Sequence, residues 1–199
     1  MQRLEENQVT KVAGHIKIVD PETGEVFVDK RNAINYENMS IALAYSLAGI
    51  TDGDGTTGDP YNILQIGFGN GGVNVTGTGA LSYRATNTGT VSGTLYNQTY
   101  VKGVASSQTA DTENNMRVSH VGGNNYSDVV ITATLGYNEP SDQMEFDTAT
   151  DSDGNYVFDE LGIKLRTGEY ISHVIFHPVQ KSANRKIQVI YTVRITAGS

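Results

Sequence analysis

Two histidines, His173 and His177, are the side chains in this chain best suited to binding a metal ion or moving a proton. They stand in a segment whose pattern predicts a strand, so they share a face but lie about 13 Å apart at the usual rise. Two strand ligands for one zinc ion should stand at positions i and i+2 instead. We therefore interpret each histidine as a surface or interface residue and predict no metal site there.

The adjacent carboxylates Asp159 and Glu160 are the next candidates, because paired carboxylates perform general acid–base chemistry. Their spacing does not identify a glycosidase pair. Glu160 precedes Leu161-Gly162-Ile163, and we predict that it is structural, an inward-pointing carboxylate bonded to loop amides. The chain has no cysteine nucleophile and no G-x-S-x-G elbow. We expect no catalytic residue and no enzyme activity.

Two stretches rich in Asp and Gly, residues 51–60 and 151–155, resemble calcium loops, since hard cations bind several oxygens on a flexible turn. The glutamate that an EF-hand needs at its twelfth position is missing. Asp153-Gly154 also fits a type I′ turn between strands. We predict solvated acidic turns and no bound metal, with calcium binding as the alternative.

The glycines Gly67, Gly69 and Gly72 match the dinucleotide-binding pattern G-x-G-x-x-G. That pattern binds a pyrophosphate only when a helix N-terminus follows it. Residues 73–79 have no helical period. We predict no cofactor, and interpret the glycines as a tight turn or bulge where another backbone approaches closely.

Composition limits the remaining possibilities. The chain of 199 residues fits one domain, and its 22 Gly and 11 Tyr, with no Cys or Trp, are typical of a turn-rich β protein. A net charge of −8 argues against direct binding of nucleic acid. No apolar run approaches the roughly 20 residues of a membrane span, and the N-terminus lacks a signal-peptide core. We expect a soluble chain made in the cytoplasm, with no membrane partner.

Strands must position most of these residues. Residues 14–19 and 25–29 flank a reversal that contains Pro and Gly, which predicts a β-hairpin. Alternating apolar side chains in residues 169–179 and 186–196 predict two strands with one buried face each. Their linker is short and polar, so we expect these two strands to pair antiparallel. Buried strands are further expected at residues 62–68 and 127–135.

Residues 35–49 have the one convincing helical pattern. Asn35 or Asn38 can cap its N-terminus, and Gly49 stands where a helix-ending glycine belongs. The apolar stripe should pack on the sheet, with binding of a partner as the alternative. The stripe consists of Met39, Leu43 and Leu47.

The predicted fold is mainly β: an antiparallel β-sandwich, jelly-roll-like, with one short α-helix packed on it and long loops. Residues 1–13 are expected to form an N-terminal arm, and residues 14–199 a single domain with a loop-rich insertion at about 76–125. We interpret the insertion as loops that lie on a neighbouring subunit, or as a loosely packed domain edge. Six side chains are the candidate contact residues: Tyr83, Tyr96, Tyr100, Tyr126, His173 and His177.

Several segments occur in an order that resembles virion structural proteins of tailed bacteriophages, especially those of T4-like and marine phages. The segments are 17–26, 30–34, the predicted helix, 66–72, 156–163 and 173–181 with its Phe-His-Pro-Val-Gln-Lys core. The likeness covers both ends of the chain but not residues 76–125. Its motifs are structural rather than catalytic, so no active site is carried over.

This resemblance implies a structural subunit of a virion, assembled in the host cytoplasm. Its expected partners are other virion proteins and copies of itself in a symmetric homo-oligomer. A neck, tail or baseplate position is the first expectation, and a head (capsid) decoration protein is the alternative. A carbohydrate- or receptor-binding module is a further alternative, in which tyrosines would have to stack on sugars because the chain has no Trp.

Overall fold

The computed structural model describes residues 10–49, 60–90, 92–104, 113–140 and 156–198. These residues form one helix and eleven strands, and every pair of hydrogen-bonded strands among them is antiparallel. The mainly β, antiparallel fold expected from the sequence is therefore confirmed. In chain order the elements are β1 (Lys11–Val19), β2 (Val26–Ile34), α1 (Tyr36–Ala48), β3 (Ile63–Gly69), β4 (Val73–Val75), β5 (Leu81–Tyr83), β6 (Gln98–Gly103), β7 (Asn114–Ser119), β8 (Tyr126–Leu135), β9 (Tyr156–Leu165), β10 (Ser172–Lys181) and β11 (Ile187–Thr196).

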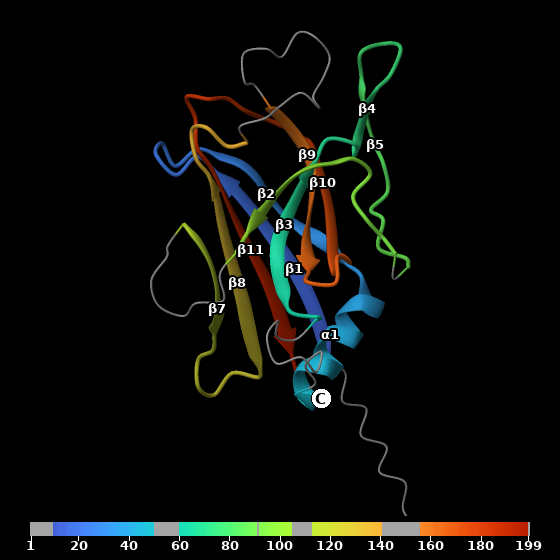
Figure 1. Ribbon diagram of the computed structural model, residues 1–199, viewed down its shortest axis with the longest axis vertical. Helices are drawn as coiled ribbons and strands as arrows, with labels where there is room; N and C mark the ends of the chain where they lie inside the picture. The colour runs from blue at the N-terminus through green and yellow to red at the C-terminus, as the bar shows by residue number, and fades with distance from the viewer. Residues whose placement is uncertain (1–9, 50–59, 91, 105–112, 141–155, 199) are drawn as a thin grey trace, which may run out of the picture.

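Nine of the strands form one sheet, in the order β6-β3-β9-β10-β2-β1-β11-β8-β7. The sheet curls until β6 approaches β8, so it is nearly closed into a barrel (Figure 1). β4 and β5 form a separate two-stranded hairpin that lies beside β10. Buried side chains from β3, β9 and β10 and from β1, β2, β8 and β11 fill the interior, among them Ile16, Phe68, Ile131 and Phe158. One shared hydrophobic cluster therefore joins these two sets of strands.

β10 and β11 carry the apolar side chains expected of the two closing strands, but they do not pair with each other. β10 lies between β9 and β2, whereas β11 lies between β1 and β8. Their linker crosses the tip of the β1–β2 hairpin, where Arg185 Nε lies 3.9 Å from Asp20 Oδ2. The predicted pairing is wrong because alternation determines which face of a strand is buried, not which strand lies beside it.

The β1–β2 hairpin forms where the sequence predicts it. The Asp20 carboxylate accepts hydrogen bonds from the amides of Glu22 (2.8 Å) and Thr23 (3.2 Å), which fixes the turn. Gly24 completes the turn with a φ of 75°, a conformation that glycine adopts without strain. β1 begins at Lys11, so residues 11–13 belong to the sheet rather than to the expected arm.

α1 is capped at the residues that the sequence indicates, but it is buried over less of its length than expected. Asn35 accepts a hydrogen bond from the Asn38 amide at 3.2 Å, and Gly49 ends the helix with a φ of 62°. Met39 is 5% exposed, whereas Leu47 is 89% exposed. The expected packing of Leu47 is wrong because only the first turns of α1 meet the sheet. Among the described residues no helix is long and apolar enough to cross a membrane.

Residues 76–125 include three strands as well as loops. β5, β6 and β7 lie in this segment, and β6 and β7 form the two edges of the nine-stranded sheet. Leu95 and Val104 are buried, at 5% and 6% exposure. The segment therefore contributes to the sheet and to the packed interior.

Candidate functional site

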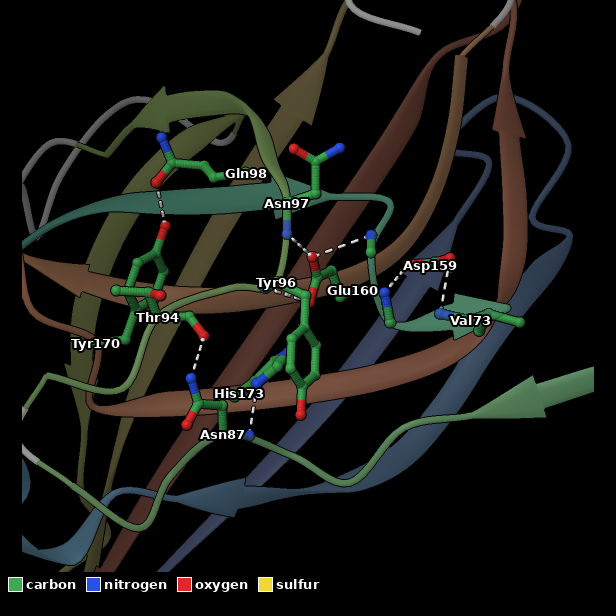
Figure 2. Close-up of polar contacts among 12 residues, drawn as sticks. Val73, Asn87, Thr94, Tyr96, Asn97, Gln98, Asp159, Glu160, Tyr170 and His173 are labelled. Atoms are coloured by element: carbon green, nitrogen blue, oxygen red, sulfur yellow. Dashed lines mark hydrogen bonds and ion pairs between the residues drawn. The ribbon is translucent and has the colours of Figure 1, made fainter. Parts of the chain in front are cut away.

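Three buried polar side chains form the centre of the candidate site: Asp159 and Glu160 on β9, and His173 on β10 (Figure 2). Glu160 is 0% exposed, His173 1% and Asp159 4%. They bind backbone amides of the turn 70–73, which follows β3, and of the segment 87–97, which precedes β6. We call these three residues the buried polar cluster.

A change of phase along β9 allows both carboxylates to face the loops. Phe158 and Leu161 both lie in the hydrophobic core, although strict alternation would put them on opposite faces. The register between β9 and β10 shifts at the same place, as it does at a β-bulge. The two residues between them, Asp159 and Glu160, therefore both reach the loops.

Glu160 holds two loops with one carboxylate. Its Oε1 accepts hydrogen bonds from the amides of Gly71 (3.1 Å) and Asn97 (2.8 Å). Its Oε2 accepts from the Tyr96 amide (3.0 Å) and lies 2.9 Å from His173 Nε2. The sequence-based prediction of an inward-pointing carboxylate bonded to loop amides is confirmed. A substrate could reach these oxygens only by displacing the loops, so the arrangement fixes structure rather than exposing a reactive group.

His173 supports Glu160 from the opposite side. Its Nδ1 lies 2.9 Å from the Asn87 backbone amide, which can only donate. The ring proton therefore sits on Nε2 and is donated to Glu160. The expectation that His173 is a surface residue is wrong, because the segment 87–97 covers this part of β10.

Asp159 fixes the start of the β4–β5 hairpin, and its pKa is shifted in the opposite direction to that of Glu160. It accepts hydrogen bonds from the amides of Gly72 (2.8 Å) and Val73 (3.1 Å). Burial raises the pKa of Asp159 to about 6, despite these bonds. Burial also opposes ionisation of Glu160, but its hydrogen bonds from His173 and the loop amides outweigh that effect and hold its pKa below the usual value.

The glycine-rich turn brings backbones into close contact, as its sequence predicts. A Cβ atom at Gly69 would lie 2.4 Å from the Asn97 carbonyl oxygen, and one at Gly72 would lie 2.9 Å from a methyl carbon of Ile175. The element that follows the turn is β4, not a helix. The amides of the turn already donate to the carboxylates of Asp159 and Glu160. This described turn therefore lacks the helix N-terminus that presents amides to a dinucleotide.

Four of the six expected contact residues gather on or over β10, and His173 is the buried one among them. The Tyr83 hydroxyl lies 3.1 Å from His177 Nδ1, and the Tyr96 ring centre lies 5.6 Å from that of His173. The guanidinium carbon of Arg84 stands 4.6 Å from the centre of the Tyr96 ring. We call the exposed residues Tyr83, Arg84, Tyr96 and His177 the β10 face. Sequence reasoning missed Arg84, although its isolated charge in residues 60–101 could have marked it.

The other two expected contact residues lie elsewhere. Tyr100 is half-buried on β6, where its ring centre lies 6.3 Å from that of Phe68. Tyr126 is on β8, with the Arg194 guanidinium carbon 4.0 Å from its ring centre. Neither lies in the β10 face, so the structure divides the six residues between separate regions.

The part of the chain that the structure describes holds no group of three or more His, Asp or Glu side chains that could bind a metal ion. Residues 51–59 and 151–155, the two acidic stretches considered for calcium, lie outside the described residues. The alternative of calcium binding there stays a prediction.

Comparison with known proteins gave no relative. No family model matches the chain, and no curated protein or solved structure matches it either.

Proposed function

We propose that this chain is a structural subunit of a tailed-phage virion, placed in the neck, tail or baseplate, which assembles through contacts between subunits and catalyses no reaction. It would be assembled in the host cytoplasm as a symmetric homo-oligomer and bind other virion proteins. The resemblance of its ordered segments to such proteins motivates the proposal. The observation that carries it is the gathering of Tyr83, Tyr96 and His177 on one exposed face.

The β10 face has physical properties that suit a contact surface. Tyr83 is 51% exposed and Tyr96 39% exposed, so both offer aromatic area to a neighbour. The Tyr96 backbone is bonded to Glu160, and the Tyr96 hydroxyl donates to the Ala85 carbonyl at 2.8 Å. Binding to such a surface needs little further ordering, which favours association.

We further propose that the sheet is organised as a jelly-roll-like β-sandwich. One layer would be β6-β3-β9-β10 and the other β2-β1-β11-β8-β7. The ladder between β10 and β2 consists of two residue pairs, Ser172–Ile34 and His173–Ala33, so the two halves join at a narrow junction. The hydrophobic cluster drawn from both halves is consistent with facing layers.

The test is the oligomeric state of the purified full chain, measured by light scattering after size exclusion. We expect a closed oligomer whose mass falls toward that of the monomer in Tyr83→Ser and His177→Ser. Tyr36→Ser is the matched control, because Tyr36 is 69% exposed but lies on α1. A wild-type chain that stays monomeric and does not bind phage particles would refute the proposal.

Two alternatives are separated by further measurements. Labelled subunits imaged on particles distinguish a neck or tail position from decoration of the head. A carbohydrate-binding module is favoured by one observation, the exposed rings of Tyr83 and Tyr96 beside polar groups, which could stack on sugars. Glycan-array binding that is lost in Tyr83→Ser, without self-association of the wild type, would favour that module.

A further inference from the structure

The junction between β2 and β10 opens into a fork. After the Ala33–His173 pair the two strands separate, and the described ladder between them ends. A pocket of about 190 Å³ lies in the fork and is also lined by the segment that follows β5. This volume is smaller than the roughly 300–1,000 Å³ of pockets for drug-sized ligands, so it suits a single small group.

Three cationic residues line this pocket: Lys30, Arg31 and Arg84. Lys30 Nζ donates to the Ile175 carbonyl at 2.8 Å, which holds the ammonium group in the fork and leaves its other protons for a ligand. Arg84 lies against the Tyr96 ring, and this stacking limits its orientation. Both arginines are exposed, and Arg31 also lines a second pocket, which contains Asp128.

These cations are not neutralised by the described residues that line the pocket, none of which is acidic. Asp29, which neighbours Lys30 in the sequence, lies 2.8 Å from His15 instead. Asp159 interacts electrostatically with Arg84, but its two oxygens accept hydrogen bonds from the Gly72 and Val73 amides. Like charges held around one small volume repel each other, and this repulsion is relieved when an anion enters.

We propose that the fork pocket is a binding site for an oxyanion, a phosphate or a carboxylate group. Arginine guanidinium groups bind such groups through two parallel hydrogen bonds, and the lysine adds a third donor. The anion could be free phosphate or an acidic group on another molecule, and both share this chemistry. The site shares Tyr83 and Arg84 with the β10 face but does not depend on the proposed virion role.

The test is calorimetric titration of the full chain with sodium phosphate and, separately, with sodium acetate, both at constant ionic strength and neutral pH. We expect saturable binding of at least one anion. Arg84→Gln and Arg31→Gln should each weaken it about tenfold or more, the loss expected for a hydrogen bond between charged groups. Lys11→Gln removes the same charge from an exposed residue that does not line the pocket, and should leave the affinity unchanged.

The two anions identify the source of the ligand. Tighter binding of phosphate assigns the site to phosphate groups, whereas equal or tighter binding of acetate assigns it to carboxylates. The proposal would be overturned if neither anion bound saturably. It would also be overturned if Lys11→Gln lost as much affinity as Arg84→Gln and Arg31→Gln. Thermal melts without the anions establish that the variants fold. If the variants do not fold, the Arg84 side-chain NMR signal of the wild type is followed in the same titrations. A saturable shift of that signal supports binding at this pocket, and an unchanged signal contradicts it.

Discussion

The loops over β9 and β10 and the helix α1 both cover the barrel, but they are held in different ways. The loop cover is fixed by directional hydrogen bonds from backbone amides to Asp159, Glu160 and His173. The helix cover is held at its first turn by the Met39 side chain and by the Asn38 side-chain amide, which donates to the Tyr170 carbonyl at 2.9 Å, whereas its last turn carries the 89% exposed Leu47. A cleft of about 380 Å³ stays open between α1 and the sheet.

This difference teaches that a regular sequence pattern does not measure how firmly a segment is held. The helix has recognisable caps and a partly apolar stripe, yet only Asn38 and Met39 are buried in it. The loops have no period, yet one fully buried carboxylate accepts three of their amides. Buried charge-assisted hydrogen bonds are strong and are costly to leave unmade, so the loop cover should be the more rigid of the two.

Replacement of Glu160 by Gln should have the largest effect. The neutral amide would turn one accepting oxygen into a donor, facing either loop amides or the His173 Nε2 proton. We expect the free energy of unfolding to fall by about 3–5 kcal/mol, as when a buried charged partner is removed. Urea denaturation measures it, with the exposed Glu37→Gln as the control, which should cost less than about 1 kcal/mol. Equal losses in the two variants would contradict the claim that Glu160 holds the loops more firmly than α1 is held.

Asp159→Asn should change the pH dependence of stability. The pKa of Asp159 is raised to about 6 from an ordinary 3.8, so the folded chain binds this proton more tightly than the unfolded chain does. The stabilisation that protonated Asp159 contributes to the folded chain is therefore present below about pH 4. It is lost as the pH rises to about 6, by up to about 3 kcal/mol.

The measurement is the free energy of unfolding of wild type and Asp159→Asn at several pH values between about 4 and 7. Wild-type stability should decline relative to the variant, which cannot titrate at this position. Glu160 is present in both proteins, and its pKa is held below the usual value, so it titrates below the range in which Asp159 does. Parallel profiles would show that Asp159 is not perturbed by its burial under the loops.

Gly162→Ala should test how tightly β9, β10 and the neighbouring Tyr170 are packed. An added Cβ would lie 2.4 Å from the Ser172 carbonyl oxygen and 2.6 Å from a ring carbon of Tyr170. We expect a loss of about 1–3 kcal/mol, typical of overpacking. Gly103→Ala is the matched strand control, because its added Cβ would meet no atom within 4 Å. Thermal melting of both variants measures the difference, and a stable Gly162→Ala would contradict the close approach.

Leu47→Ala should have the smallest effect, a change within about 0.5 kcal/mol, because the side chain has little contact to lose. Met39→Ala, on the buried part of the same helix, should cost about 2 kcal/mol or more. Chemical denaturation of the two variants compares them. A large loss for Leu47→Ala would show that the whole helix packs as its apolar stripe predicts.

Local signals in the sequence were sufficient for the turns and caps. Asp20 and Gly24 identify the first hairpin, and Asn35 and Gly49 identify the ends of α1, because each acts on neighbouring backbone groups. Strand neighbours could not be derived, since pairing depends on contacts between distant segments. The linker of β10 and β11 is short, yet the β1–β2 hairpin lies between these strands in the sheet.

The site was predictable in part for the same reason. The role of Glu160 followed from a carboxylate placed before an apolar strand segment. The shared orientation of Asp159 and Glu160 did not, because a period of two puts neighbours on opposite faces until a bulge changes the phase. Burial of His173 depends on a segment that begins 86 positions earlier in the chain, at Asn87.

Native-state amide hydrogen exchange tests most directly whether the loop cover is the rigid one. If Glu160 fixes the loops, the amides of Gly71, Tyr96 and Asn97 should exchange only through global unfolding, while amides in the last turn of α1 exchange through smaller openings. Exchange of those three loop amides at rates near those of an unfolded peptide, with α1 protected, would contradict the account.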